Sequence, residues 1–276
     1  MVGYDLTRLL IGSEGTLAII TEAVLKLTPL PETRRTLRAI YRDIQSASRA
    51  VAAIMAQAVT PCALEFIDKA ALDMIRDYST AELPAQAGAL LMIEVDGSAA
   101  SIDAAVESIR YAAANDGLLD FMAAQGKAEV AALWATRKAL SPALRKIAPK
   151  KINEDVVVPV SRIPELISGL ESLASQHDIK IVNFGHAGNG NIHVNLLVNP
   201  DDPAEMQAAH QCLDDVFSLV LQLEGSLSGE HGVGIEKRDF VAREINPTAL
   251  QLMQAIRLQF DPNAILNSGK TLPAIP

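Results

Sequence analysis

One stretch near residue 190 constrains the fold more than any other part of the sequence. Residues 183–195 read NFGHAGNGNIHVN, in which a Gly/Asn cluster separates two strand-like runs. The pair Asn189 and Gly190 favours a two-residue type I′ turn, because both central positions of that turn require positive φ. A hairpin built on this turn places His186 directly opposite His193. We therefore expect an antiparallel sheet that carries two histidines beside a tight turn.

The strand after this turn has two different faces. Polar and apolar residues alternate from residue 191 to residue 196, so one face is apolar and the other carries His193 and Asn195. Opposed residues on antiparallel strands have Cβ atoms about 5 Å apart, and two imidazoles at that spacing can reach one metal ion. Two other interpretations fit the same residues. The histidines could be half-buried core residues with satisfied hydrogen bonds, or they could form a pH switch.

Strand-like and helix-like segments alternate along most of the chain. The order predicts an α+β fold of the ferredoxin-like kind, an antiparallel sheet with helices packed on one face. Before it, residues 16–28 are rich in Ile, Leu, Val and Thr, and we expect them to be extended up to Pro29 and Pro31. Strands are predicted at 37–41, 62–67, 90–95, 118–123, 155–158, 179–186 and 191–198, and helices at 43–58, 69–78, 98–115, 127–144, 163–176, 204–224 and 247–260.

Composition excludes several classes of protein. The net charge of −9 over 276 residues, with no basic run, argues against a nucleic-acid partner. Cys62 and Cys212 lack CxxC spacing, so neither a disulfide framework nor a thiolate metal site is expected. No apolar stretch approaches the roughly 18 residues of a membrane span, and no secretory signal is evident. We expect a cytoplasmic protein, with peripheral attachment to a membrane as an alternative.

A second glycine-rich stretch, GSLSGEHGVGIEKRDF at residues 225–240, holds Glu230 and His231 between glycines. Glycine lets the backbone approach a ligand closely. A carboxylate there would complete a set of two histidines and one carboxylate, while the adjacent histidine stays available for proton transfer. The alternative is a polar lead-in to a helix that starts near Ile235, with Glu230 favoured by the helix dipole.

Two weaker features remain. In LWATRK, Arg137 follows the only tryptophan, and its planar guanidinium suits bidentate binding of a carboxylate; a solvated amphipathic helix with a basic end at Lys150 and Lys151 explains the same residues. In GSEGT, residues 12–16, a turn before a strand offers backbone N–H groups to a phosphate or a ring carbonyl.

Six motifs together resemble the FAD-linked oxidases of the vanillyl-alcohol-oxidase type, and among them the D-2-hydroxyacid dehydrogenases that act on lactate, glycolate or 2-hydroxyglutarate. In chain order they are DLTRLLIGSEGTLAIITEAVLKLTPLP, LWATRK, NEDVVVP, GHAGNGNIHVN, GEHGVGIEKR and LNSGKTLP. The resemblance implies FAD as cofactor, a divalent metal, usually zinc, and oxidation of a D-2-hydroxyacid to the 2-oxoacid. It also implies a quinone, a cytochrome or an electron-transfer flavoprotein as electron acceptor, and a homodimer is an open expectation.

The resemblance also assigns roles to single residues. The implied metal ligands come from both glycine-rich stretches. The implied base directly follows the carboxylate ligand in the sequence, and it takes the hydroxyl proton of the substrate as the α-hydride passes to the flavin. The implied metal ligands are His186, His193 and Glu230, the base is His231, the substrate-binding residues are Arg137, Ser141, Lys151 and Asn195, and the residues that face the flavin are Gly12, Gly15, Thr16 and Asn267.

The sequence departs from the family pattern at a few positions. Asn189 stands where Asp is common, Ser268 where Pro is usual and Ala18 where Gly is usual. The N-terminal FAD-binding half is not found in this chain, so we expect residues 1–32 to be the end of that domain and residues 33–276 the substrate- and metal-binding domain. Such a fragment is expected to bind FAD poorly and to be inactive alone. A non-redox metal-binding sensor or partner module and a metal-assisted hydrolase are alternatives.

Overall fold

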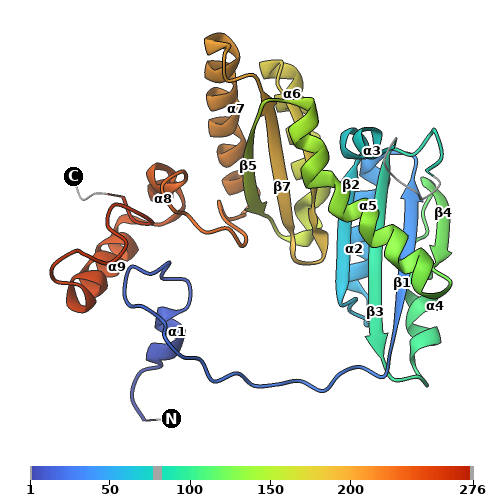
Figure 1. Cartoon of the computed structure of the whole chain (residues 1–276), viewed down its shortest axis with the longest axis horizontal. Helices are drawn as coiled ribbons and strands as arrows, with labels where there is room; N and C mark the ends of the chain where they lie inside the picture. The colour runs from blue at the N-terminus through green and yellow to red at the C-terminus, as the bar shows by residue number, and fades with distance from the viewer. Residues whose placement is uncertain (1, 77–82, 274–276) are drawn as a thin grey trace. The chain divides into compact units, whose positions relative to one another are not determined.

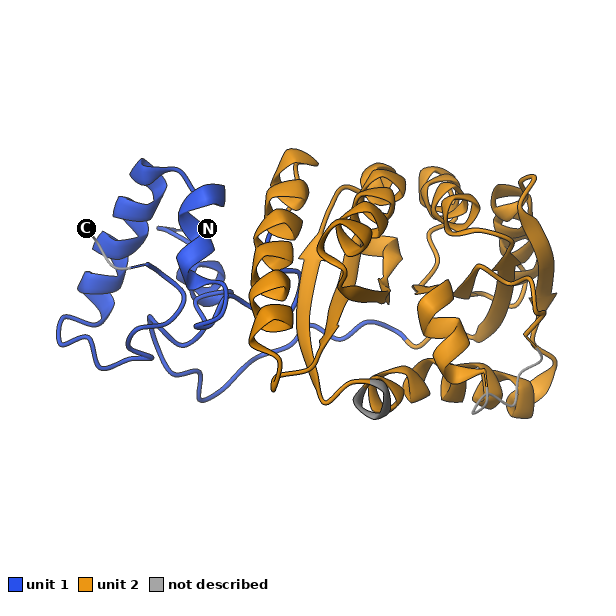
Figure 2. Ribbon diagram, turned by 90° about the horizontal axis from the view of Figure 1, so that it is seen from above, with its two compact units in different colours: residues 1–29, 226–276 blue, residues 30–225 orange. Residues whose placement is uncertain are grey.

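The structure, a computed structural model, describes residues 2–76 and 83–273. Contacts divide the chain into two compact units (Figure 2). The first combines residues 1–29 with residues 226–276, and the second comprises residues 30–225. We call them the loop unit and the sheet unit, because all seven strands lie in the second.

The sheet unit contains one antiparallel sheet of seven strands in the order β4-β1-β3-β2-β6-β7-β5 (Figure 1). Its first four strands follow the chain order β-α-β-β-α-β of a ferredoxin-like unit, with the short helix α3 (Lys69–Ile75) inserted between β2 and β3. The last three repeat the arrangement of β2, β3 and β1, and the two parts join where β2 pairs with β6. The strands are β1 (Thr33–Tyr41), β2 (Ala63–Asp68), β3 (Ala89–Gly97), β4 (Leu118–Ala123), β5 (Lys150–Val157), β6 (Lys180–His186) and β7 (Asn191–Val198).

Helices cover both faces of this sheet. Helices α2 (Ile44–Ala56), α4 (Ile102–Ala113), α6 (Ile163–His177) and α7 (Pro203–Gln222) pack side by side, and all four contact strands. Helix α5 (Gly126–Ile147) crosses the other face together with α3 (Lys69–Ile75), over a core of Ile67, Leu90, Met92 and Phe184 (Figure 1). The α+β, ferredoxin-like class is confirmed, and α5 adds a layer on the second face.

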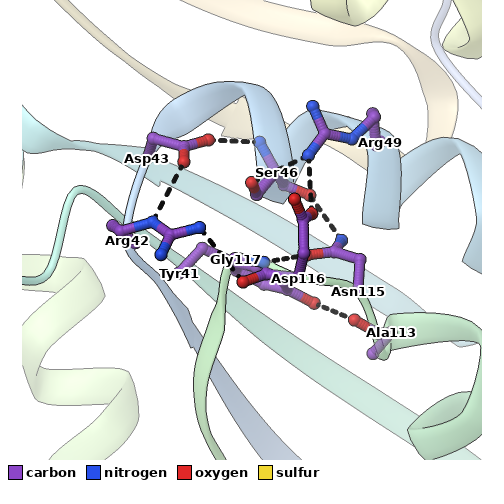
Figure 3. A network of polar contacts seen from close by, with 9 residues as sticks. All are labelled: Tyr41, Arg42, Asp43, Ser46, Arg49, Ala113, Asn115, Asp116 and Gly117. Atoms are coloured by element: carbon purple, nitrogen blue, oxygen red, sulfur yellow. Dashed lines mark hydrogen bonds and ion pairs between the residues drawn. The ribbon is translucent and has the colours of Figure 1, made fainter.

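A network of polar contacts closes the first ferredoxin-like part at the corner between β1 and α2 (Figure 3). The Tyr41 hydroxyl donates to the Ala113 carbonyl at 2.8 Å, and the Asn115 amide donates to the Ser46 carbonyl at 3.0 Å. A Cβ at Gly117 would overlap the Ser46 side chain, so only glycine fits there. These contacts attach the loop before β4 to the start of α2 and fix the edge strand.

Buried Asp68 links the two parts of the sheet. It caps α3 by accepting from the Ala71 N–H at 2.7 Å, and it accepts from the Asn183 N–H of β6 at 2.6 Å. Burial raises the pKa of its carboxyl to about 7, against the lowering effect of these hydrogen bonds. One side chain therefore holds a helix start and the β2–β6 junction.

The loop unit has little regular structure. It contains α1 (Leu6–Leu10), η3 (Arg238–Phe240), α8 (Val241–Glu244) and α9 (Pro247–Phe260). Residues 18–31 pair with no strand in the described part of the chain, so the segment predicted to be extended contributes nothing to the sheet. The helix that the alternative interpretation placed near Ile235 begins later, as a 3₁₀ turn at Arg238. By contacts, residues 226–276 group with the N-terminal segment.

Candidate functional site

The β6–β7 hairpin brings two histidine rings together in a register that differs from the predicted one. Phe184 pairs with His193, and His186 pairs with Asn191, so the prediction that His186 faces His193 directly is wrong. The connection is longer than a two-residue turn, since a 3₁₀ turn over Ala187–Asn189 (η2) precedes Gly190. A shift of two residues preserves the face, and the two rings lie 5.3 Å apart at 83°.

The two histidines differ in burial. His193 is 7% exposed and packs edge-on against the Phe184 ring at 5.7 Å, whereas the His186 side chain is 37% exposed. Two borderline imidazole donors from one sheet face, one deep and one near the surface, suit a divalent transition metal. The hairpin therefore supplies a fitting pair of nitrogen ligands.

A buried glutamate in the neighbouring strand connects this pair to helix α5. Glu65 of β2 accepts a hydrogen bond from His186 Nδ1 through one oxygen and from Arg137 Nε at 2.6 Å through the other. The Arg137 guanidinium also lies 4.9 Å from the centre of the Phe184 ring. Arg137, His186 and His193 thus share one face of the sheet.

Glu65 is charged in this setting. Burial raises its pKa, but the hydrogen bonds from His186 and Arg137 and the positive charge of Arg137 outweigh burial and lower the pKa below its ordinary value. Sequence reasoning missed this residue. The available signal was a single acidic residue inside the apolar strand CALEFID.

The remaining predicted substrate residues lie on the same sheet face or on α5. Asn195 is fully buried, and its amide donates to the Val182 carbonyl at 3.0 Å and accepts from Asn153 at 2.7 Å. Lys151 belongs to β5, which starts earlier than predicted, and its register puts it on the face of His193. Ser141 is exposed on α5, one turn beyond Arg137.

The loop unit brings the flavin-facing candidates together around Glu14. Its carboxylate accepts from the backbone N–H groups of Val233 and Gly234 at 2.8 and 2.9 Å and from the Thr271 hydroxyl at 3.1 Å. Asn267 donates to the Glu14 carbonyl. The GSEGT turn, the GEHG loop and the LNSGKT stretch therefore meet at one residue.

The predicted residues of the loop unit have these surroundings. Glu230 and His231 are exposed and lie just before the N–H groups that Glu14 binds. Gly12 and Gly15 have positive φ, at 83° and 72°. Thr16 is buried, and its hydroxyl donates to the Ser13 carbonyl at 2.7 Å. Neither an ion nor a flavin contact is needed to explain these bonds, so the roles of these residues stay predictions.

Comparison with known families gives a match over most of the chain. A family model described as "FAD linked oxidases, C-terminal domain" matches residues 30–271. The glycolate oxidase subunit GlcD of Bacillus subtilis is 38% identical over 98% of this chain, and GlcD of Escherichia coli K12 is 33% identical over 99%. A D-lactate dehydrogenase of Anaerostipes hadrus is 33% identical over 97%. This chain spans 57%, 55% and 58% of those proteins, about half of their length.

Solved structures share the fold at low sequence identity. p-Cresol methylhydroxylase with substrate bound aligns with a TM-score of 0.67 over 88% of this chain and 53% of its own, at 14% identity. Alkyldihydroxyacetonephosphate synthase aligns with a TM-score of 0.65 over 98% of this chain and 51% of its own, at 18% identity. Within the described residues, no helix has the length and apolar character required to cross a bilayer.

Proposed function

Since this chain belongs to the family of FAD linked oxidases, C-terminal domain, we propose that it is the substrate- and metal-binding part of a flavin-dependent dehydrogenase. Its substrate would be a D-2-hydroxyacid of the lactate, glycolate or 2-hydroxyglutarate class, oxidised to the 2-oxoacid. Relatives named for glycolate and D-lactate support this substrate class. The observation that carries the proposal is the joint placement of His186, His193 and Arg137 on one sheet face, around Glu65.

In this proposal each residue acts on a defined part of the substrate. Arg137 binds the carboxylate, for which its planar fork of N–H donors is suited. Lys151 and Ser141 add donors to the same group, and Asn195 shapes the wall beneath it. His231 accepts the hydroxyl proton, which a neutral imidazole does well near neutral pH. Bound FAD supplies the acceptor of the α-hydride, so the protein's part is to bind, orient and deprotonate.

The proposed metal site consists of His186, His193 and Glu230. Two imidazoles and one carboxylate suit zinc and also other divalent transition metals. An ion held there would supply Lewis acidity to the substrate hydroxyl.

The flavin contacts and the setting of the protein are proposals of the same kind. Gly12, Gly15, Thr16 and Asn267 would face FAD, which would be bound mainly by a separate N-terminal FAD-binding half. Residues 1–32 would then close that domain and residues 33–276 would form the substrate domain. We place the protein in the cytoplasm, with a quinone, cytochrome or electron-transfer flavoprotein as electron acceptor and a homodimer as its assembly.

The test is reconstitution of flavin reduction. This chain would be co-expressed with the FAD-binding half of a family member, and flavin absorbance followed after addition of D-lactate, glycolate or D-2-hydroxyglutarate, with L-lactate as control. We expect bleaching by at least one D-2-hydroxyacid and loss of bleaching in His231→Ala. As a positive control, the C-terminal half of the same family member is co-expressed with its own FAD-binding half, which shows whether two separately expressed halves assemble into an active enzyme. Bleaching with that control and none with this chain would contradict the proposal.

A further inference from the structure

Two buried glutamates attach helix α5 to the sheet, and only one of them touches the candidate site. Glu94 of β3 accepts from Trp134 Nε1 of α5 at 2.9 Å and from the Thr36 hydroxyl at 2.9 Å. Glu65 of β2 accepts from Arg137, three residues along the same helix. Both glutamates are about equally buried, at 6% and 5% exposure. A substitution of Glu94 therefore shows how the loss of a buried carboxylate beneath α5 affects folding stability without removing a contact to the candidate site.

The contact between Glu65 and His186 determines which ring nitrogen faces outward. A carboxylate can only accept, so the proton shared with it belongs to His186 Nδ1. The other nitrogen, Nε2, is then deprotonated in the neutral ring and able to bind a cation. Histidines that bind metals commonly donate their second N–H to a carboxylate, which fixes both tautomer and ring orientation.

The contact between Glu65 and Arg137 fixes a second group at the same time. The 2.6 Å hydrogen bond uses only Nε, one of the five N–H donors of the guanidinium. The ion pair is nearly dry, with side-chain exposures of 16% for Arg137 and 7% for Glu65. The ring of Phe184 supports the guanidinium from its face at 4.9 Å. Arg137 is therefore held at a set distance from His186 through a single side chain.

From these contacts we propose that Glu65 is the positioning residue that couples metal binding to substrate-carboxylate binding. It holds the ligand His186 through one oxygen and Arg137 through the other. This inference rests on the proposed function. It adds that the distance between the metal and the carboxylate-binding group, and so the size of the α-hydroxycarboxylate unit that fits, is set by one buried glutamate.

Glu65→Gln is the decisive variant, because an amide cannot satisfy both partners. If its oxygen accepts from Arg137, its NH₂ group faces His186 Nδ1 and requires the opposite tautomer, with the proton on Nε2. If the amide is flipped, two donors meet at Arg137. In the first case His186 can no longer offer Nε2 to a metal, and in the second Arg137 loses its acceptor. The first case is favoured, because the amide oxygen then faces the charged guanidinium. Glu65→Asp keeps the charge but is one methylene shorter and cannot reach both partners equally.

The experiment measures Zn²⁺ affinity of the full 276-residue chain by competition with a chromophoric chelator. Wild type is compared with Glu65→Gln, Glu65→Asp and the matched control Glu94→Gln, and unfolding midpoints show that each variant is folded. We expect Glu65→Gln to weaken zinc binding roughly 10- to 100-fold, Glu65→Asp to fall between, and Glu94→Gln to stay within about threefold of wild type. Long-range ¹H–¹⁵N spectra of the metal-free chain should show His186 change tautomer only in Glu65→Gln.

The outcomes separate the inference from the proposed function. Zinc binding that is lost in His193→Ala but unchanged in Glu65→Gln, with the same His186 tautomer, would overturn the role of Glu65 and leave the proposed metal site intact. Equal weakening in Glu65→Gln and Glu94→Gln would also overturn it, since both would then act through packing. Equal zinc affinity in wild type and His193→Ala would contradict the proposed metal site itself, and the role of Glu65 with it.

Discussion

In the sheet unit, His193, Glu65 and Arg137 are buried or nearly so, and each is packed against the hairpin or helix α5. In the loop unit, Glu230 and His231 are exposed on a glycine-rich loop. The sheet residues are oriented by side-chain contacts within a core, whereas the loop next to Glu230 and His231 is held by backbone N–H groups of Val233 and Gly234 that donate to Glu14. The side chains of the sheet unit are therefore held in place before any ligand binds, whereas the conformation of the loop depends on a few hydrogen bonds.

Glycine and Glu14 together explain how the loop holds its conformation. Gly232 and Gly234 have φ of 81° and 55°, a region that costs other residues energy. A Cβ at Gly232 would also lie 2.9 Å from the Glu14 carboxyl carbon. The loop can therefore wrap closely around Glu14 only because both positions are glycine.

The largest expected effect is a loss of Zn²⁺ affinity, which should be greater for a substitution in the sheet unit than for one in the loop unit. His193→Ala should weaken Zn²⁺ binding by at least about 100-fold, or roughly 2.7 kcal/mol, because a buried nitrogen ligand has no nearby replacement. Glu230→Ala should weaken it only about 10-fold, because water can replace a carboxylate on an exposed loop. Chelator competition measures both values, with His210→Ala as the control. Equal losses in the two variants would contradict the division into rigid and adaptable parts.

Arg137→Lys should affect substrate binding and spare the metal. A lysine is a point charge without the planar fork, and it cannot repeat the contact with Glu65 and a bidentate carboxylate contact together. In the reconstituted enzyme we expect KM for the D-2-hydroxyacid to rise about 10- to 100-fold, equivalent to about 1.4–2.7 kcal/mol, with zinc affinity unchanged. Lys138→Ala, at an exposed neighbouring position on the same helix, is the control for a substitution of α5 outside the site and should leave KM unchanged. A normal KM in Arg137→Lys would exclude bidentate binding.

Glu14→Gln should loosen the loop and leave the sheet unit unchanged. The amide keeps one acceptor, so one of the two N–H groups at Val233 and Gly234 loses its partner. Amide hydrogen exchange at these two residues should accelerate about 10-fold, which corresponds to about 1.4 kcal/mol of local stability. Glu22→Gln, at an exposed position of the segment before β1, is the control. If exchange stays slow, the glycines alone hold the loop.

The smallest expected effect is a pH dependence confined to the sheet unit. Asp68 has a pKa raised to about 7 by burial, so the folded protein keeps a proton that the unfolded chain releases near pH 4. Its contribution is complete below about pH 4 and is lost as pH rises through 7, so the free energy of unfolding should fall by about 1 kcal/mol between pH 6 and pH 8. Denaturant titrations check this slope, which Asp68→Asn should remove. If the free energy of unfolding of Asp68→Asn still falls between pH 6 and pH 8, a group other than Asp68 is responsible for the pH dependence.

The sequence predicted the sheet unit well because its local patterns agree with its tertiary structure. Alternation and capping located the strands and helices, and the α+β, ferredoxin-like class was confirmed. The predicted register of the hairpin was wrong because a 3₁₀ turn precedes Gly190. A Cβ at Gly190 would overlap the Val158 carbonyl, and this neighbour cannot be predicted from the local sequence. The predicted and observed registers differ by two residues, an even number, so the two histidines still lie on the same face of the sheet.

The contacts that orient the site were beyond sequence reasoning. Glu65 is 121 residues from His186 and 72 from Arg137, and Glu14 is 219 residues from Val233. Such pairs depend on the order of the strands in the sheet and on the packing of loops, and the local spacing of apolar and polar residues predicts neither. The helix that the alternative interpretation placed near Ile235 begins only at Arg238, because Glu14 binds the N–H groups of Val233 and Gly234 in a turn conformation.

The most direct test of the account is X-ray absorption at the zinc edge on the chain loaded with one equivalent of Zn²⁺. The proposed site predicts two imidazole nitrogens at about 2.0–2.1 Å and one or two oxygen ligands, with one imidazole lost in His186→Ala. A shell of oxygens alone, or a spectrum that His186→Ala leaves unchanged, would contradict the claim that the β6–β7 hairpin is a metal-binding element.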